Sequence, residues 1–181
     1  MNFLDIVKLR QSVRSYAEYP VEHEKIEKCL EAARFAPSAD NSQPWKFIVV
    51  DDDELRNKVA KETFNSIVPF NRFTLTAPVL IVVVTEKENF VTKFAGAIKK
   101  TQFNLVGLGI AVEHFCLQAV EEKLGTCILG WFNKKGVKKA LNIPKNEDVD
   151  VVIALGYPKT ETIREKKRKK IEDIRAYNKY F

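Results

Sequence analysis

The sequence predicts helices packed against a β-sheet, in a sandwich of the α/β or α+β class, and three observations lead to this prediction. Short β-branched runs alternate with segments of helical periodicity along the 181 residues, which is the order typical of such sandwiches. Residues 78–84 (PVLIVVV) are apolar on both faces, as expected for a central strand that is covered on each side. Residues 98–124 are apolar nearly all round, so we expect a long helix buried in the core or against another subunit.

Local patterns predict the remaining elements. Residues 22–35 carry apolar side chains at the helical period, and Pro37 ends the helix that they predict. Residues 45–50 (WKFIVV) predict a strand, and the acidic run at 51–54 suits the start of a helix, where negative charge meets the helix dipole. Beyond Gly125, which closes the long helix, we expect strands at 126–131 and 149–155 with a short helix at 134–141 between them.

Composition limits the class of protein. Hydrophobic residues make up 45% of the chain and charged residues 30%, a balance typical of globular domains. The longest run without a charge, residues 73–85, is 13 residues long, whereas a membrane-spanning helix needs about 20. The first residues, MNFLDIVKLRQS, contain charges and no long apolar stretch. We therefore expect neither a membrane span nor a secretory signal.

The net charge of +6 is unevenly spread along the chain. Residues 159–181 hold nine Lys or Arg and four Asp or Glu, so the rest of the chain is close to neutral. A nucleic-acid-binding domain normally spreads a basic face over its fold, and we expect no nucleic-acid partner. No repeat or Gly/Ser-rich linker divides the chain. The sequence thus predicts one domain over residues 1–181, with a basic C-terminal extension at about 159–181.

Several chemistries are disfavoured by what the sequence lacks. Cys29, Cys116 and Cys127 are an odd count without CxxC spacing, and the two histidines lie far apart. This argues against a disulfide framework and a zinc site, and favours a reducing, cytoplasmic compartment.

The sequence has no GxxxxGK[ST] phosphate loop and no GxSxG nucleophile elbow. His114 stands two residues from Cys116 on a helix, where the two side chains do not face each other, so a Cys–His dyad is disfavoured. The stretch 107–109 (GLG) lacks the third glycine of a dinucleotide fingerprint, and we interpret it as close helix packing.

Two segments carry candidate chemistry. Residues 10–14 (RQSVR) place two guanidiniums and a hydroxyl on one side of an extended stretch, which suits a phosphate because arginine offers a fixed fork of donors. Alone, such a cluster is more often solvated surface. Residues 36–45 (APSADNSQPW) form a proline-bounded loop that presents amides and hydroxyls beside Trp45. An ordinary helix-to-strand loop uses the same turn residues. The informative feature is the combination of two prolines, small polar residues and Trp45 in one loop.

Together the two segments resemble the FMN-dependent nitroreductase family. That family opens with an R-x-S-x-R stretch, matched by Arg10, Ser12 and Arg14, and about 25 residues later carries a P-S-x-x-N-x-Q-P-W loop, matched by residues 37–45. Weaker matches then follow in the family's order over nearly the whole chain: Ala77-Pro78 before an apolar strand, Leu124-Gly125 after the long helix, 128–131 (ILGW), 141–144 (LNIP), and 155–158 (LGYP) before a basic tail.

The resemblance implies an α+β fold in which helices flank a central, mostly antiparallel sheet. It also implies an obligate homodimer with two FMN molecules bound at the subunit interface. The R-x-S-x-R stretch would contact the ribityl phosphate and the flavin edge, and the loop at 37–41 would come from the other subunit. Leu129 and Gly130 would lie along the ring, with a backbone N–H near flavin N5.

In the tail, Lys166 and Arg168 correspond to the family's basic pair at the phosphate, with Lys167 as an alternative register by one residue. Asn71 matches a family asparagine at the pyrimidine edge. No catalytic side chain and no metal are expected, since the chemistry takes place at FMN N5. The cofactor-binding residues that the resemblance implies are Arg10, Gln11, Ser12, Arg14, Pro37, Ser38, Ala39, Asn41, Gln43, Asn71, Leu129, Gly130, Lys166 and Arg168.

The resemblance further implies an oxidoreductase. Such an enzyme transfers a hydride from NADH or NADPH through FMN to a small acceptor, such as a nitroaromatic or a quinone, by a ping-pong mechanism. One alternative is a flavoprotein of the same fold that dehalogenates its substrate or degrades flavin. Another is a non-enzymatic module that binds an acidic partner through residues 164–170 (REKKRKK), but such a module would not need the loop at 37–45. The stretch between Val84 and Ile98 is too brief for a large lid, which leaves the substrate open.

Overall fold

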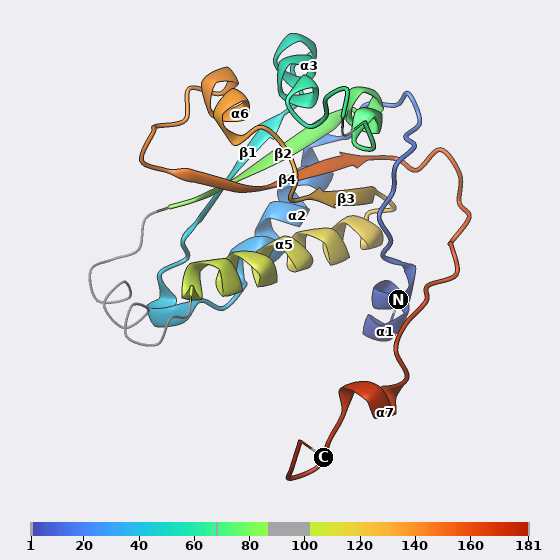
Figure 1. Ribbon diagram of the computed structural model, residues 1–181. Helices are drawn as coiled ribbons and strands as arrows, with labels where there is room; N and C mark the ends of the chain where they lie inside the picture. The colour runs from blue at the N-terminus through green and yellow to red at the C-terminus, as the bar shows by residue number, and fades with distance from the viewer. Residues whose placement is uncertain (1, 68, 87–101, 181) are drawn as a thin grey trace.

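A four-stranded antiparallel sheet lies between two layers of helices in the computed structural model, which describes residues 2–67, 69–86 and 102–180 (Figure 1). The strand order is β1-β2-β4-β3, so β2 and β4 are central and β3 forms an edge. The strands are β1 (Trp45–Val50), β2 (Val79–Thr85), β3 (Gly125–Leu129) and β4 (Asp148–Gly156). The antiparallel pairing of all neighbours decides between the two predicted classes in favour of α+β.

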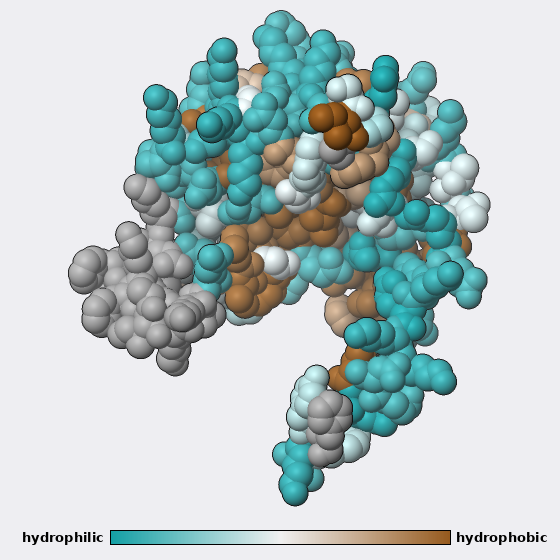
Figure 2. Space-filling model, in the orientation of Figure 1, coloured by the Kyte–Doolittle hydropathy of each residue, from teal (hydrophilic) through white to brown (hydrophobic). Residues whose placement is uncertain are grey.

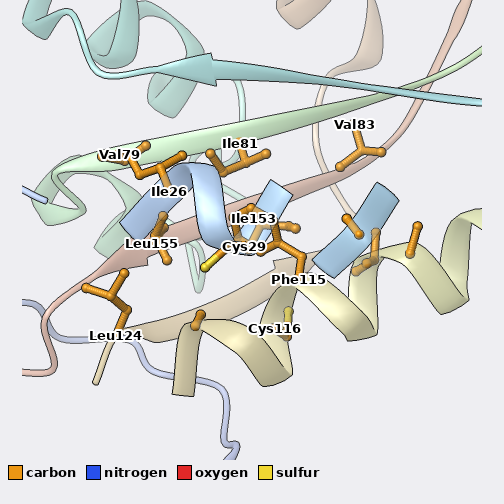
Figure 3. Packing of buried hydrophobic residues seen from close by; sticks show 14 of the residues in the cluster. Ile26, Cys29, Val79, Ile81, Val83, Phe115, Cys116, Leu124, Ile153 and Leu155 are labelled. Carbon is orange, nitrogen blue, oxygen red and sulfur yellow. The ribbon is translucent and has the colours of Figure 1, made fainter. Parts of the chain in front are cut away.

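One face of the sheet is covered by α2 (His23–Arg34) and α5 (Phe103–Glu121). Side chains from both helices meet the inward-facing residues of β2 and β4, with Phe115 at the centre of the cluster (Figure 3). Its ring stacks on that of Phe47 at a centroid distance of 5.9 Å. Gly107 lies where α5 meets the loop before β1, and a Cβ there would approach the Trp45 ring at 3.2 Å. The interpretation of this glycine as a close-packing residue is confirmed.

The opposite face is covered by α3 (Asp53–Lys61), α6 (Lys134–Ala140) and the 3-10 helix η2 (Arg72–Thr76). The Asp52 carboxylate accepts a hydrogen bond from the Leu55 amide at 2.9 Å and caps α3, as the acidic run predicted. Helices thus pack on both faces of the sheet. This is why the residues of β2 from Val79 to Val84 are all buried and why its sequence is apolar without alternation.

Two predicted elements differ from the structure by more than one residue at an end. The long helix was expected over 98–124; its described part is Phe103–Glu121, and residues 98–101 lie outside the described residues, as does most of the stretch between Val84 and Ile98. The strand expected at 126–131 ends at Leu129, because the chain then turns toward η2, where the Asn71 amide donates to the Trp131 carbonyl at 3.0 Å.

By length and composition alone, α5 is the one described helix that could cross a membrane. In the fold 44% of its most apolar stretch is buried, against α2 and the sheet. Glu113, midway along it, forms an ion pair with Arg10. Its apolar composition is therefore explained on one side by core packing.

Three short helices lie outside the two layers: α1 (Phe3–Leu9), the 3-10 helix η1 (Ala39–Asn41) and α7 (Ile171–Ile174). The sequence patterns did not predict α1. After β4 the chain descends beside α1 and continues away from the body of the molecule to its C-terminal end (Figure 1).

Candidate functional site

The stretch 10–14 lies against the edge strand β3. Arg10 follows α1 directly, and its amide donates to the Ile6 carbonyl at 2.9 Å. Ser12 forms a parallel bridge with Thr126, whose carbonyl accepts a hydrogen bond from the Val13 amide at 2.8 Å. The extended conformation expected for this stretch is thus fixed by a backbone bond to the sheet. Val13 is buried in the core, whereas the Arg14 side chain is exposed.

The basic tail lies beside the same stretch. The Ala17 amide donates to the Tyr157 carbonyl at 2.9 Å, and the Lys159 amide donates to the Ser15 carbonyl at 3.0 Å. Further along, the Arg164 guanidinium donates to the Ser12 carbonyl. The two ends of the chain, far apart in the sequence, therefore form one surface.

A pocket of about 260 Å³ opens between the two ends. Its walls carry six cationic side chains and one carboxylate, and within the described part of the chain no ion pair joins the tail cations of this pocket to an acidic residue. Such a lining selects for an anion that can accept several charge-assisted hydrogen bonds at once. The lining residues are Arg10, Gln11, Ser12, Arg14, Arg164, Glu165, Lys166, Lys167 and Arg168.

Crowding of like charges contributes to a lowered pKa of Lys166. Loss of hydration lowers the pKa of this lysine below 10.5, and repulsion from Arg10 and Arg168 lowers it further. An anion placed among these groups would relieve the repulsion. The electrostatics of the pocket therefore favour a multiply charged anion over a neutral ligand.

Glu113 approaches the anion pocket from α5. Its Oε1 atom lies 3.4 Å from Nε of Arg10, and the arginine side chain is only 22% exposed. Burial raises the pKa of Glu113, while the charge of Arg10 opposes that rise. The ion pair ties the guanidinium of Arg10 to the middle of α5, so its position depends on the packing of that helix.

The turn after β3 offers a second surface on the same edge of the sheet. Leu129 is buried, whereas a Cβ at Gly130 would meet no atom within 4 Å. The Asn71 side chain is buried and bonded to the Trp131 carbonyl, and the ring of Trp131 lies 5.9 Å from that of Phe70. An open backbone beside two partly exposed aromatic rings suits the face of a planar ligand.

The loop between α2 and β1 is held in one conformation by its own polar groups. Ser38 Oγ accepts from the Gln43 amide at 2.9 Å, and the Gln43 side chain donates to the Asn41 carbonyl at 3.2 Å. Asp40, Asn41 and Gln43 all have positive φ angles, which ordinary residues adopt only where the surrounding structure requires it. Pro37 and Ala39 belong to the same turn, so five predicted residues share a single rigid loop.

This loop and the anion pocket lie at opposite ends of α5 within one chain. Figure 1 shows η1 beside the start of the helix, whereas α1 and the tail lie beside its far end. The structure therefore brings together Arg10, Gln11, Ser12, Arg14, Lys166 and Arg168, and places Leu129, Gly130 and Asn71 on the same edge of the sheet. It does not bring the residues of the 37–43 loop to them.

The outward face of α5 is unusually apolar. Leu105 and Val106 are 41% and 56% exposed, and a Cβ at Gly109 would meet no atom within 4 Å. Figure 2 shows apolar surface on the lower side of the body, where α5 lies in Figure 1. An exposed apolar face is typical of an interaction surface.

Among the described residues, neither the cysteines nor His114 is placed to act as a nucleophile. Cys29, Cys116 and Cys127 are all buried and free, and burial raises the pKa of both Cys29 and Cys116 to about 12. The His114 ring is bound to the Ala32 carbonyl at 3.2 Å. Among the described residues no group of three His, Cys, Asp or Glu could hold a metal ion.

A larger groove, of about 810 Å³, runs along the stretch 15–21 and away from the anion pocket. Its walls mix carboxylates with cations, as Asp51 and Asp53 stand near Arg56. The Arg56 guanidinium already donates to Asp53 at 2.7 Å and to the Ala77 carbonyl at 2.8 Å. The smaller pocket is the better candidate for an anion because six of its seven charged side chains are cationic.

Sequence reasoning missed two residues of the site. Arg164 lies in the pocket, although the family pattern points only to the positions two and four residues later. Glu113 reaches Arg10 from the middle of a helix that was interpreted through its apolar residues. The basic run at 164–170 includes Arg164 but did not single it out as a binding residue. No sequence signal connects Glu113 to Arg10.

Comparison with known proteins agrees with this geometry. The model described as "Nitroreductase family" matches residues 7–72 and 65–157. A protein of Archaeoglobus fulgidus that carries the name NADH dehydrogenase/NAD(P)H nitroreductase is 33% identical over 165 residues, which cover 87% of this chain and 86% of the relative. An iodotyrosine deiodinase of Thermotoga neapolitana is 26% identical over 168 residues, which cover 85% of this chain and 87% of the relative.

Solved structures show the same fold. A nitroreductase family protein from Clostridium novyi NT superposes with a TM-score of 0.79 at 33% identity, covering 88% of this chain and 86% of the other. An FMN-dependent nitroreductase from Clostridium difficile R20291 superposes with a TM-score of 0.74 at 27% identity, covering 98% of this chain and 99% of the other.

Proposed function

This chain belongs to the nitroreductase family, and we propose that it is an FMN-dependent oxidoreductase that passes a hydride from NADH or NADPH to a small acceptor. The names of its relatives support the donor and the cofactor. The main support for the proposal is the anion pocket, which is lined by cationic side chains from both ends of the chain.

The donor set of that pocket fits the phosphate of FMN. A phosphate monoester carries about −1.5 to −2 charges at neutral pH and three acceptor oxygens. Arg10, Arg14 and the tail cations would supply charge-assisted donors, with the Ser12 hydroxyl as a neutral one. The isoalloxazine ring would lie along Leu129 and Gly130, with Asn71 and the Gly130 backbone as polar neighbours. The sequence has no dinucleotide fingerprint of the kind that binds the diphosphate of FAD.

When bound, FMN supplies the two-electron redox chemistry that no side chain here provides. The net reaction converts NAD(P)H, a proton and a quinone into NAD(P)⁺ and a hydroquinone. For a nitro compound, NAD(P)H and a proton yield the nitroso compound, NAD(P)⁺ and water. The role of the protein is to fix the phosphate with Arg10 and Arg14, to leave space beside Gly130 for the reactants, and to keep competing nucleophiles away from the site.

We further propose that two chains form the complete site. The 37–43 loop lies away from the anion pocket within one chain, and the face of α5 that carries Leu105 and Val106 is apolar. An obligate interface of this kind resembles a core cut in half. We expect sedimentation to show a dimer at micromolar concentration. A folded monomer under those conditions would contradict this part of the proposal.

The function is tested by the cofactor and by its reduction. The purified protein should be yellow, and flavin released by heat should co-migrate with FMN on a column. Anaerobic addition of NADH or NADPH should bleach the flavin absorption band, and a quinone or nitroaromatic should restore it. Release of FAD, or absence of flavin after incubation with FMN, would contradict the proposal.

The lowered pKa of Lys166 predicts how FMN affinity depends on pH. Phosphate favours the charged ammonium, so binding should weaken as the pH rises through the lowered pKa and the lysine loses its proton. The Lys166→Arg variant keeps its charge and should show a flat profile. Riboflavin, which has no phosphate, corrects for titration of the ring. The same decline for FMN in both proteins would show that Lys166 does not meet the phosphate.

A second candidate function is reductive dehalogenation. The similarity to the Thermotoga neapolitana iodotyrosine deiodinase, which extends over 85% of this chain, favours it as the alternative. Both candidates share the flavin site and differ only in the acceptor. Reoxidation of the reduced protein by an iodophenol, with release of iodide, would favour the second candidate over a quinone or nitro acceptor.

A further inference from the structure

The two ends of the chain run antiparallel and keep a common register. Backbone hydrogen bonds pair Ala17 with Tyr157 and Lys159 with Ser15. The Lys166 ammonium donates to the Lys8 carbonyl at the corresponding position further along. The alignment thus extends past the last backbone pair, through the stretch that carries the anion pocket.

Backbone pairing between the ends cannot continue past Ser15. The Val13 amide donates to the Thr126 carbonyl of β3 at 2.8 Å, so the next backbone donor in the N-terminal stretch is used by the sheet. Side chains therefore hold the tail where the pocket lies: the Arg164 guanidinium donates to the Ser12 carbonyl, and the Lys166 ammonium donates to the Lys8 carbonyl.

The side chain of Gln11 occupies that position. Its Nε2 atom donates to the Thr162 carbonyl at 3.0 Å, and its Oε1 atom accepts from the Arg164 amide at 3.2 Å. Oε1 also accepts from Nε of Arg164 at 3.4 Å. In the register of the two ends, Gln11 stands opposite residue 163. Its side-chain amide bonds to the residues on either side, Thr162 and Arg164. It uses its donor and its acceptor as a peptide group does in a β-ladder.

We infer that Gln11 is a positioning residue that clamps the C-terminal tail in register, and that Arg164, which it holds, is an anion-binding residue of the pocket. This inference rests on the proposed function for the identity of the anion. It differs from the role that the family resemblance implied for Gln11, which was direct contact with the cofactor.

Electrostatics explain why a neutral clamp is needed. Docking Arg164 and Lys166 beside Arg10 and Arg14 brings cations together. Loss of hydration lowers the pKa of Lys166, and repulsion from Arg10 and Arg168 lowers it further. A lysine at position 11 would add to the repulsion and could not accept a hydrogen bond. A glutamate could not donate to Thr162 and would place negative charge in an anion site. An amide satisfies both partners without charge.

The first test uses the protein without flavin and follows hydrogen exchange of the Arg164 amide by NMR. In Gln11→Met this amide should exchange about tenfold faster than in the parent, because it loses its acceptor. Gln118→Met is the matched control: its side-chain amide donates to Glu122, whose carboxylate also pairs with Lys28 of α2, and none of these residues lines the pocket. In this variant Arg164 should keep the exchange rate of the parent. Unchanged exchange in Gln11→Met would overturn the clamp whether or not the protein binds FMN.

The second test compares the dissociation constants of FMN and riboflavin. Gln11→Met and Arg164→Met should each weaken FMN binding about tenfold and leave riboflavin unchanged, and the double variant should be no weaker than Arg164→Met. Additive losses would mean that Gln11 meets the phosphate itself, and equal losses for riboflavin would mean a merely structural role. Either result overturns the inference. A parent protein that binds no FMN would instead refute the proposed function and the anion-binding role of Arg164, while the exchange test still decides the clamp.

Discussion

Replacing Arg10 with alanine is expected to weaken FMN binding about 100-fold, which corresponds to about 2.7 kcal/mol. The variant removes a cation from the pocket wall and at the same time deprives Glu113 of its partner at 3.4 Å. The half-buried carboxylate then stands near the phosphate without compensation. Riboflavin should bind the variant nearly as well as the parent, because it presents no phosphate.

A matched control is Lys58→Ala, which breaks an ion pair with Glu54 at 2.6 Å on the exposed side of α3. Surface pairs of this kind contribute little to stability, and FMN affinity should not change. The melting temperature of Arg10→Ala should be measured alongside, to show that the fold is retained. An affinity for FMN equal to that of the parent would remove Arg10 from the phosphate site.

Replacing Phe115 with alanine should lower the free energy of unfolding by about 3–5 kcal/mol. The ring is fully buried between α5 and the sheet and stacks on Phe47, so its removal leaves a cavity (Figure 3). At about 2–4 °C per kcal/mol for a chain of this size, the melting temperature should fall by roughly 10 °C. Urea denaturation at a fixed FMN concentration would measure the loss.

The control for this variant is Tyr19→Ala, since Tyr19 is 67% exposed and leaves no cavity when truncated. Its unfolding free energy should stay within about 0.5 kcal/mol of the parent. An equally small change for Phe115→Ala would mean that the cluster between α5 and the sheet is not the main core of the protein.

The strands were predictable because each is a short β-branched run whose limits are set by burial. Residues 45–50 form β1 as predicted, and the apolar run at 78–84 differs from β2 by one residue at each end. The helix α1 was not predictable, because its seven residues bury none of their side chains. The antiparallel order of the sheet came from the family resemblance, since local patterns left the α/β class open.

By itself the sequence determined most strands and helices of the two layers, and it predicted an anion at the site. The periodicity of hydrophobic residues fixes helices and strands locally, whereas the pairing of Arg10 and Arg14 with the basic tail at an anion was implied by the family resemblance. Only the tertiary structure decided which residues meet. Gln11 holds Arg164 across 153 positions of sequence, and Glu113 reaches Arg10 from another helix. Such contacts follow from the register between distant segments, which is set by packing and by hydrogen bonds that no local pattern encodes.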